Sequence, residues 1–551
     1  MRPGASLTAT DLTRAHGAFV VLDRVSLAVG PRSRIGVVGP NGVGKTTLLR
    51  ILAGIEAPDS GRVAVTPPGL TVGYLPQETT ARPGETLAAY LARRTGVAAA
   101  EAELEEAAGG LAGAASAGAD RYAAALDRYL ALGGPDLEAR AAAVCADVGL
   151  PTDRLQVELA DLSGGQVARA ALAAILLSRF DVLLLDEPTN DLDFAGLERL
   201  ERFLAGLRGP NAETGLDGGL VVVSHDRAFL EVTVDRVVEL DEHRRSATEF
   251  GGGWLAYLEA RATARRHAEE DHAEYRTQHT GLVDRARTQR QWAQVGASRA
   301  RKSPPDNDKN RRNFTVNRTE KQAAKVRITE KALDRLEVVD KPWESWDLQL
   351  ELSPATRSGD VVARLHRAVV ERGGGQFRLG PLDLEITWAE RVAITGPNGS
   401  GKTTLLRALL GELALSRGER WLGPGVVVGE LDQGRRTFAT GQPLLAAFET
   451  ASGLLTQEAR SLLAKFGLGA AHVGRPADGL SPGERTRATL ALLMARGANC
   501  LVLDEPTNHL DLPAIEQLER ALDRYDGTLL VVTHDRRLLD GLRTTRTIEM
   551  G

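Results

Sequence analysis

The chain contains one ordered set of motifs twice, and this repeat limits its fold more than any other feature. Four motifs recur in the same order in the two halves. They are "GPNGVGKTT" at Gly39–Thr47 with "GPNGSGKTT" at Gly396–Thr404, "LSGGQ" at Leu162–Gln166 with "LSPGE" at Leu480–Glu484, "LDEPTN" at Leu185–Asn190 and at Leu503–Asn508, and "VVSHDR" at Val222–Arg227 with "VVTHDR" at Val531–Arg536. The shared order predicts the duplication of one large unit rather than a solenoid of short repeats.

The spacing between motifs locates an insertion in the first copy. Gln77 and Ser163 are 86 positions apart, whereas Gln433 and Ser481 are 48 apart, so the first copy holds 86 − 48 = 38 additional residues. We place this surplus at about 91–131. Its Ala, Leu and Glu content favours two helices and its glycine-rich middle favours a turn, so the sequence predicts an inserted helical arm.

Composition is that of an ordinary globular protein. The 551 residues suggest roughly three or four domains of ~150 residues each, and 43% of them are hydrophobic and 26% charged. Cys145 and Cys500 lack CxxC partners, which argues against a zinc site or a disulfide framework and favours two small apolar side chains in a reducing cytosol. The N-terminus has no apolar leader region, and no run of ~18 apolar residues predicts a membrane span.

The two glycine-rich motifs predict phosphate loops between a buried strand and a helix. Glycines let backbone N–H groups surround phosphates, and the helix N-terminus adds partial positive charge. In this pattern Lys45 and Lys402 reach the β- and γ-phosphates, and the hydroxyls of Thr46 and Thr403 bind Mg²⁺. The predicted nucleotide-binding residues of the loops are Gly39, Pro40, Asn41, Gly42, Val43, Gly44, Lys45, Thr46 and Thr47, and Gly396, Pro397, Asn398, Gly399, Ser400, Gly401, Lys402, Thr403 and Thr404.

Two adjacent carboxylates follow a second apolar run in each half, Asp186 with Glu187 and Asp504 with Glu505. Such a run predicts a buried strand, which presents these side chains at the edge of the sheet where ligands bind. There the aspartate holds Mg²⁺ through water and the glutamate orients the attacking water. Solvated surface carboxylates are the alternative, which the matched phosphate loops make the weaker interpretation.

A histidine ends a third apolar run in each half. His225 follows "GGLVVVS" and His534 follows "GTLLVVT". A histidine at such a strand end can contact the γ-phosphate. One histidine alone would more often be incidental, but its repetition in register favours a catalytic role.

This motif order resembles the ATP-binding cassette ATPases over both halves. The resemblance implies two cassettes that close head to tail, so that each signature motif completes the site of the other cassette. The first site would then contain Lys45, Thr46, Gln77, Asp186, Glu187 and His225 with Ser481, Gly483 and Glu484. The second would contain Lys402, Thr403, Gln433, Asp504, Glu505 and His534 with Ser163, Gly164, Gly165 and Gln166. Gln77 and Gln433 would join the threonines and aspartates as Mg²⁺ ligands, and the loops Asn190–Asp193 and Asn508–Asp511 would couple the sites.

The sequence departs from the family pattern at a few positions. Pro482 stands in the second signature where glycine is usual. The resemblance assigns adenine stacking to His16 in the first copy; in the second we find no aromatic residue, and Arg372 is the candidate for its place. Both glutamates are present, so we expect both sites to hydrolyse ATP.

The segment between the repeats combines helix formers with a basic middle. We predict a linker at 255–340 between cassettes at 1–254 and 341–551, with a first helix of about 45 residues, a tip at about 299–318 that contains Pro304 and Pro305, and a second helical run. From Gly281 to Glu330 there are thirteen Lys or Arg and five Asp or Glu, a net of +8 in a chain of net −5. This asymmetry predicts a polyanionic partner, although a solvated hairpin stays possible. The candidate RNA contacts are Arg299, Arg301, Lys302, Lys309, Arg311, Arg312 and Phe314, with Trp292 as a second stacking residue.

Fused cassettes, a long helical linker and an arm in the first cassette resemble the ABC-F family, most of all its antibiotic-resistance members. The resemblance implies an α/β fold with two P-loop cassettes, each a mixed sheet with a helical subdomain, joined by an α-helical hairpin. It implies a cytoplasmic, monomeric ATP hydrolase that uses ATP and Mg²⁺ and binds the bacterial ribosome near the E site to protect it from drugs. A housekeeping translation factor, the ATP-binding subunit of a drug exporter and a DNA-maintenance ATPase stay open as alternatives.

Overall fold

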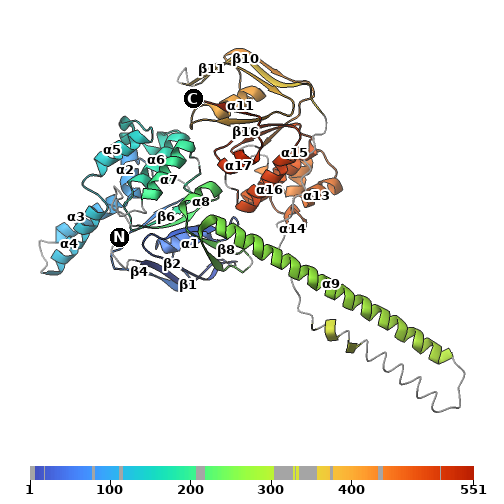
Figure 1. The fold of residues 1–551 in the computed structure, drawn as a ribbon. Helices are drawn as coiled ribbons and strands as arrows, with labels where there is room; N and C mark the ends of the chain where they lie inside the picture. The colour runs from blue at the N-terminus through green and yellow to red at the C-terminus, as the bar shows by residue number, and fades with distance from the viewer. Residues whose placement is uncertain are drawn as a thin grey trace. The chain divides into compact units, whose positions relative to one another are not determined.

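The computed structural model separates into two units, Met1–Ala256 with Trp346–Gly551 and Tyr257–Ser345. The first unit holds both copies of the repeat, and the second holds the segment between them (Figure 1). The residues that the structure describes are 6–17, 19–76, 81–110, 116–190, 192–206, 218–242, 244–302, 327–328, 331–333, 335, 357–372, 377–431, 438–508 and 510–551.

The first copy contains two sheets. An antiparallel sheet has the order β2-β1-β4, and a mixed sheet has the order β5-β6-β7-β3-β8-β9, in which only β8 and β9 pair antiparallel. The strands are β1 Ser6–His16, β2 Phe19–Val29, β3 Arg34–Val38, β4 Ser60–Thr66, β5 Val72–Leu75, β6 Val182–Asp186, β7 Gly219–Val223, β8 Arg236–Leu240 and β9 Ala247–Gly251.

The second copy repeats this plan with one strand fewer. Its antiparallel sheet has the order β11-β10-β13, and its parallel sheet has the order β14-β15-β16-β12-β17. The strands are β10 Val361–Arg372, β11 Phe377–Thr387, β12 Arg391–Thr395, β13 Arg417–Leu422, β14 Val428–Leu431, β15 Cys500–Asp504, β16 Thr528–Val532 and β17 Arg546–Glu549.

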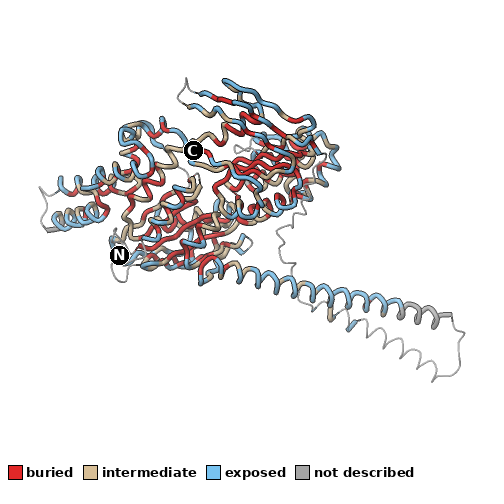
Figure 2. The backbone as a smooth tube through the Cα atoms, turned by 45° about the horizontal axis from the view of Figure 1, so that its top comes forward, coloured by how far each residue is buried: buried red, intermediate tan, exposed pale blue. Residues whose placement is uncertain are grey.

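Burial explains why the central strands have continuous apolar sequences. Every residue of β3, β6, β7, β15 and β16 is buried, because helices cover both faces of a parallel sheet. Each copy has its own apolar core, visible as red tube in Figure 2. Cys145 and Cys500 are buried free thiols, as the sequence predicted.

Helices follow the strands in both copies. In the first copy they are α1 Lys45–Leu52, α2 Leu87–Arg94, α3 Val97–Gly109, α4 Ser116–Ala131, α5 Leu137–Asp147, α6 Gly164–Leu177, α7 Phe194–Gly206 and α8 Arg227–Thr233. In the second they are α11 Lys402–Leu410, α12 Leu444–Ser452, α13 Thr456–Lys465, α14 Ala470–Val473, α15 Pro482–Ala495, α16 Leu512–Asp523 and α17 Arg536–Gly541. The pair α3 and α4 lies in the segment where the spacing places additional residues, and ion pairs Arg121–Glu106 and Arg128–Glu103 join the two helices.

The segment between the copies begins with the long helix α9, Gly253–Lys302. At about 1.5 Å per residue its 50 residues extend roughly 75 Å. Its described residues beyond the first turns are mostly exposed, as the pale blue tube in Figure 2 shows. Of the predicted second helical run, only residues 327–328, 331–333 and 335 are described; 327–328 and 331–333 are helical, and 335 is in a turn. Within the described part of the chain, no helix combines the length and apolarity that a membrane span requires.

Candidate functional site

Each phosphate loop lies between the end of a buried strand and the start of a helix. The first joins β3 to α1, and the Lys45 ammonium is buried and donates to the carbonyl oxygens of Gly39 (2.7 Å) and Pro40 (3.0 Å). Lys402 makes the same bonds in the second loop, at 2.7 and 3.0 Å. Burial lowers the pKa of both lysines, although nearby carboxylates oppose this effect.

Glycine is required in these loops by close backbone approach. Gly44 has φ +111°, and a Cβ there would lie 2.6 Å from Cγ1 of Val21. Gly396 has φ +143°, and a Cβ there would lie 2.2 Å from the carbonyl oxygen of Met550. A side chain at either position would therefore displace the strand beside the loop.

The Asp-Glu pairs lie at the carboxyl ends of the buried strands β6 and β15. Tyr74 donates its hydroxyl to Asp186 Oδ2 at 3.1 Å, and in the second copy Thr403 Oγ1 donates to Asp504 Oδ2 at 2.8 Å. The other oxygen of Asp186, Oδ1, is buried without a hydrogen-bond partner among the described residues. A hydroxyl beside a buried carboxylate is an oxygen-donor set that Mg²⁺ accepts, so these residues fit the ion.

Both glutamates have a backbone conformation that is rare for a residue with a side chain. Glu187 has φ 50° and Glu505 has φ 46°, and this left-handed region costs roughly 1–2 kcal/mol. Their backbone N–H groups donate to Val223 O at 2.9 Å and Val532 O at 2.8 Å, which hold the turn in place. Burial raises the pKa of Glu187 to about 7, and Lys45 opposes this shift. Strain and a raised carboxyl pKa together are typical of a catalytic position.

The histidines lie beside these glutamates. His225 Nε2 is 3.3 Å from Glu187 Oε1, and His534 Nε2 is 3.5 Å from Glu505 Oε1. Burial lowers the pKa of His225 well below its usual value and that of His534 to about 4. Each imidazole is therefore neutral near pH 7 and can donate one hydrogen bond from one ring nitrogen.

The signature motifs form the N-termini of α6 and α15. Ser163 and Gln166 make a capping box, in which the Ser163 N–H donates to Gln166 Oε1 at 2.9 Å. Ser481 and Glu484 make the equivalent box, with bonds of 2.7 and 3.2 Å. Pro482 stands in the first turn of α15, where its missing N–H removes no helical bond. The departure from glycine is thus compatible with the helix.

Glu484 has two basic partners. Its Oε1 lies 3.0 Å from Arg475 Nη1 and 3.3 Å from His472 Nε2. Burial would raise the pKa of Glu484, but the Ser481 N–H and the charge of Arg475 outweigh it, and the net shift is downward. The second signature therefore carries an ionised carboxylate whose charge is offset locally.

The two copies meet through the loops that follow the glutamates. Asp193 Oδ2 accepts from the Asn398 N–H of the second phosphate loop at 2.9 Å, and Asp511 Oδ2 accepts from the Asn41 N–H of the first at 3.2 Å. A Cβ on Gly165 would lie 3.7 Å from that of Asn398, so the first signature approaches the second phosphate loop. Each cassette thus contacts the phosphate loop of the other through an aspartate. The contact of Ser481, Gly483 and Glu484 with the first site stays a prediction.

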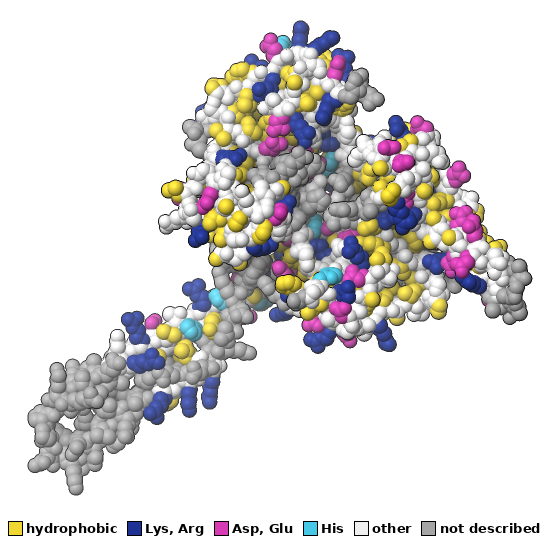
Figure 3. Space-filling model, turned by 180° about the vertical axis from the view of Figure 1, so that it is seen from behind, with side chains coloured by type: hydrophobic (Ala, Val, Ile, Leu, Met, Phe, Trp, Pro, Cys, Tyr) yellow, Lys and Arg dark blue, Asp and Glu magenta, His cyan; other side chains and the backbone are white. Residues whose placement is uncertain are grey.

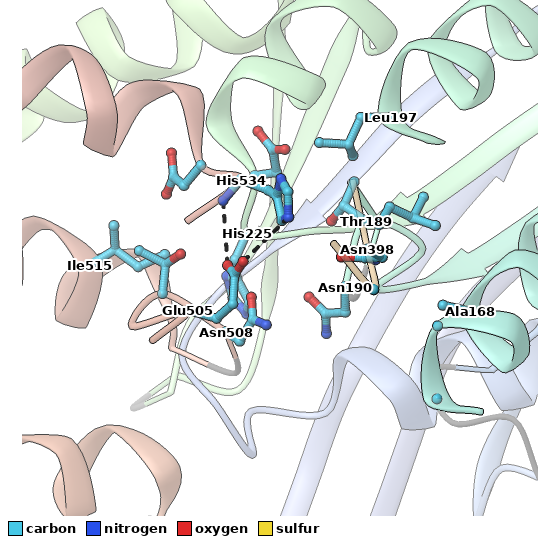
Figure 4. A pocket seen from close by; sticks show the side chains of 17 residues that line it. Ala168, Thr189, Asn190, Leu197, His225, Asn398, Glu505, Asn508, Ile515 and His534 are labelled. Carbon is cyan, nitrogen blue, oxygen red and sulfur yellow. Dashed lines mark hydrogen bonds and ion pairs between the residues drawn. The ribbon is translucent and has the colours of Figure 1, made fainter. Parts of the chain in front are cut away.

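A cavity of about 390 Å³ lies between the copies (Figure 4). It is lined from the first copy by Gly164, Gly165, Ala168, Thr189, Asn190, Leu192, Leu197, His225 and Asp226, and from the second by Asn398, Gly399, Glu505, Thr507, Asn508, Ile515, His534 and Asp535. It therefore contains the first signature together with the glutamate and the histidine of the second copy.

A second cavity of about 510 Å³ lies over the phosphate loop of the second copy, and Phe377 lines it together with Arg372 and Lys402. The sequence pattern indicated no aromatic residue at this place in the second copy, and Phe377 corrects that expectation. Phe377 is distant from the phosphate loop in sequence, and only the pairing of Arg372 with Phe377 across β10 and β11 brings it there. In the first copy His16 lines the equivalent cavity, and its Nε2 lies 3.4 Å from Thr47 Oγ1.

Phe194 is another contact that the motifs did not indicate. Its ring lies edge-on to that of His534, with centroids 5.1 Å apart and planes at 78°. One sequence feature could have indicated this contact: Phe194 is an aromatic residue directly after "NDLD", where the second copy has Leu512.

Some predicted site residues cannot be placed. Gln77 and Gln433 lie outside the described residues, as do Lys309, Arg311, Arg312 and Phe314 of the basic tip. Arg299, Arg301 and Lys302 belong to α9, but their side chains are not among those described, nor is that of Trp292. The roles of all these residues stay predictions.

Comparison with known proteins agrees with this geometry. The model of the ABC transporter family matches residues 22–190 and 379–508. The tylosin resistance ATP-binding protein TlrC of Streptomyces fradiae is 37% identical over 97% of this chain and 96% of its own. The energy-dependent translational throttle protein EttA of Mycobacterium tuberculosis is 32% identical over 97% of this chain and 89% of its own. A solved structure of the RNase-L inhibitor shares the fold, with a TM-score of 0.54 and 20% identity over 98% of this chain and 87% of its own.

These matches and the paired phosphate loops, carboxylates and signatures show two nucleotide-binding cassettes of one kind in a single chain. The protein is an ATP hydrolase, and it belongs to the ABC-F group of the ATP-binding cassette family.

Proposed function

We propose that this protein binds the bacterial ribosome in its ATP-loaded form and protects it from antibiotics that act at the peptidyl-transferase centre or the exit tunnel. The main support is the 37% identity to a tylosin resistance protein, which extends over 97% of this chain and thus includes the segment between the cassettes. The role is cytoplasmic, and one chain supplies both halves of each ATP site.

In this proposal the residues of each site have separate tasks. Lys45 and Lys402 leave their loop carbonyls to bind the β- and γ-phosphates. The threonine hydroxyls and the aspartates hold Mg²⁺, which offsets phosphate charge when bound. Glu187 and Glu505 orient the attacking water, and the neutral histidines donate to the γ-phosphate. The signatures contact the nucleotide bound by the opposite cassette.

The charge on α9 supports a polyanionic partner. The last acidic residue of the helix is Asp284, and six basic residues follow it before the helix ends. These are Arg285, Arg287, Arg290, Arg299, Arg301 and Lys302. Figure 3 shows Lys and Arg side chains in dark blue along the described part of α9. The phosphate groups of ribosomal RNA are negatively charged and would attract this basic end of the helix, and the predicted tip carries further basic residues.

Translation in a purified system tests the proposal. Ribosomes are inhibited to about one tenth of their activity with macrolides and with peptidyl-transferase inhibitors, and the protein is added with ATP. We expect synthesis to recover for at least one drug class. Deleting Lys302–Phe314 should abolish recovery while ATP turnover persists, whereas recovery by the deleted protein would contradict a role for the tip.

The second candidate is a housekeeping translation factor, which the 32% identity to a translational throttle protein favours. It predicts that the protein changes the rate of drug-free translation in an ATP-dependent way and rescues no drug. A drug-exporter subunit would require a membrane partner. Rescue in a membrane-free system would therefore exclude export as the main role.

A further inference from the structure

Two ion pairs join the cassettes next to His225 and His534, which are called the switch histidines below. Arg227, two positions after His225, makes a bidentate ion pair with Glu519 of the other cassette. Its Nη1 donates to Oε2 at 3.1 Å, and its Nη2 donates to Oε1. Arg536, two positions after His534, donates to Glu201 Oε1 of the first cassette at 2.9 Å. The side chains are 15% and 22% exposed in the first pair and 33% and 17% in the second. They are thus screened from water more than ordinary surface pairs are.

The two glutamates occupy equivalent places on helices that begin at the coupling aspartates. Glu201 lies on α7, eight positions after Asp193, and Glu519 lies on α16, eight positions after Asp511. Eight residues of helix span roughly 12 Å. Each of these helices therefore contacts the opposite cassette at two separated points, the phosphate loop through its aspartate and the histidine-bearing segment through its glutamate.

Each arginine lies two positions after its histidine, at the capped start of a helix. Asp226 caps α8 by accepting the Phe229 N–H at 3.0 Å, and Asp535 caps α17 by accepting the Leu538 N–H at 3.0 Å. Each arginine is thus the first residue of a capped helix, and each histidine lies directly before the cap. A displacement of the arginine is therefore transmitted to the histidine two positions away.

We propose that α7 and α16 are cross-braces, and that the pairs Glu201–Arg536 and Glu519–Arg227 position the switch histidine of the opposite cassette relative to its phosphate loop. Because α7 follows the Asp-Glu pair of the first site in the chain, the state of that site reaches His534 through α7. In the same way, α16 follows the Asp-Glu pair of the second site, so the state of that site reaches His225 through α16. Phe194 adds a ring contact to the brace on His534 that Leu512 does not supply on His225, so the second site is held more firmly.

Another interpretation is that the pairs only hold the cassettes together. A general loss of interface contact would slow both sites equally. A brace acts on one site, because each pair flanks one histidine. Turnover measured at one site at a time separates the two interpretations.

The experiment uses the full chain and two backgrounds, Glu187→Gln to silence the first site and Glu505→Gln to silence the second. Glu201→Arg should lower kcat about tenfold in the Glu187→Gln background, with KM for ATP changed less than about twofold, and should leave turnover in the Glu505→Gln background nearly unchanged. Glu519→Arg should show the reverse pattern. The double exchange Glu201→Arg with Arg536→Glu should recover kcat to within about threefold, which also shows that the fold tolerates the reversed charge.

Arg537 and Glu231 provide the matched control. They form an ion pair between α17 and α8, on the same two helices and across the same interface, but neither residue lies on a brace. Glu231→Arg should leave kcat within about twofold at both sites. Equal losses at both sites from Glu201→Arg, no loss, or no recovery in the double exchange would overturn the proposal.

This inference rests on ATP hydrolysis and not on the proposed ribosomal role. The assay contains no ribosomes, so its failure would leave drug protection standing. Conversely, a protein that rescues no drug could still show braced sites.

Discussion

His534 illustrates how burial sets the charge of a single catalytic candidate. Desolvation lowers its pKa to about 4, with Lys402 adding to the effect and Asp193 opposing it. The unfolded chain protonates such a histidine near pH 6.5. Between these values the unfolded state binds the additional proton, so the stabilising contribution is complete above pH 6.5 and is lost as the pH falls toward 4.

We therefore expect the variant His534→Gln to lose less stability in acid than the unmodified chain. At pH 5 the difference corresponds to about 2 kcal/mol of the free energy of unfolding. Urea unfolding of both proteins at pH 7.5 and pH 5 measures it. Parallel losses in the two proteins would show that His534 is not the group that titrates.

Phe377 is the residue-scale prediction for nucleotide recognition. It lines the cavity over the second phosphate loop, and an aromatic ring that stacks on a base contributes about 1–3 kcal/mol. Phe377→Ala should weaken ATP binding at the second site about tenfold and leave inorganic triphosphate binding unchanged. Titration of a fluorescent ATP analogue into protein that also carries Lys45→Ala measures the affinity of the second site, because the first site lacks its phosphate-binding lysine.

The control for Phe377 is Phe19. It pairs with His16 at the tip of the equivalent hairpin and is 71% exposed. Phe19→Ala should leave ATP binding at the second site unchanged within about twofold. A similar loss of triphosphate binding in Phe377→Ala would indicate damage to the loop rather than a lost stacking contact.

At the scale of elements, α9 is a long helix with little burial to hold it. Gly281 lies in it, is exposed, and has open space where a Cβ would be. Helix propensity therefore decides what a substitution does there. Relative to glycine, alanine stabilises the helix by about 1 kcal/mol, and proline destabilises it by about 2 kcal/mol.

The matched variants Gly281→Ala and Gly281→Pro test whether α9 must be straight and continuous. We expect Gly281→Ala to keep drug rescue and to raise helicity in circular dichroism. Gly281→Pro should abolish rescue while ATP turnover stays within about twofold. Rescue by the proline variant would show that α9 acts as a flexible tether instead.

The elements themselves were largely predictable. Continuous apolar runs predicted the strands β3, β6 and β7, because strands buried on both faces need no polar alternation. The length of α9 followed from helix formers without an early proline. The proposed boundaries at 1–254, 255–340 and 341–551 stay predictions. Composition does not mark such boundaries sharply, because it changes gradually along the helix that joins the first cassette to the linker.

At the scale of the whole molecule, ATP hydrolysis should end ribosome binding, because the ATP-loaded form is the one proposed to bind. The chain with both Glu187→Gln and Glu505→Gln should bind ATP without turning it over, with kcat reduced at least about a hundredfold. It should then sediment with ribosomes in the presence of ATP and remain in the supernatant without it. ATP-independent sedimentation would contradict control of binding by the nucleotide.

The sequence by itself determined the two phosphate loops, the Asp-Glu pairs, the signatures and their order, because each depends on a short run of chain that sets its own local geometry. Only the tertiary structure decided which residues meet across the cassettes. The pairs Arg227–Glu519 and Arg536–Glu201 and the placement of Phe377 join positions distant in sequence, and charge or aromaticity carries no partner information until packing fixes the distances. The raised pKa of Glu187 and the lowered pKa of His534 were equally inaccessible, since both arise from desolvation, which exists only once the fold excludes water.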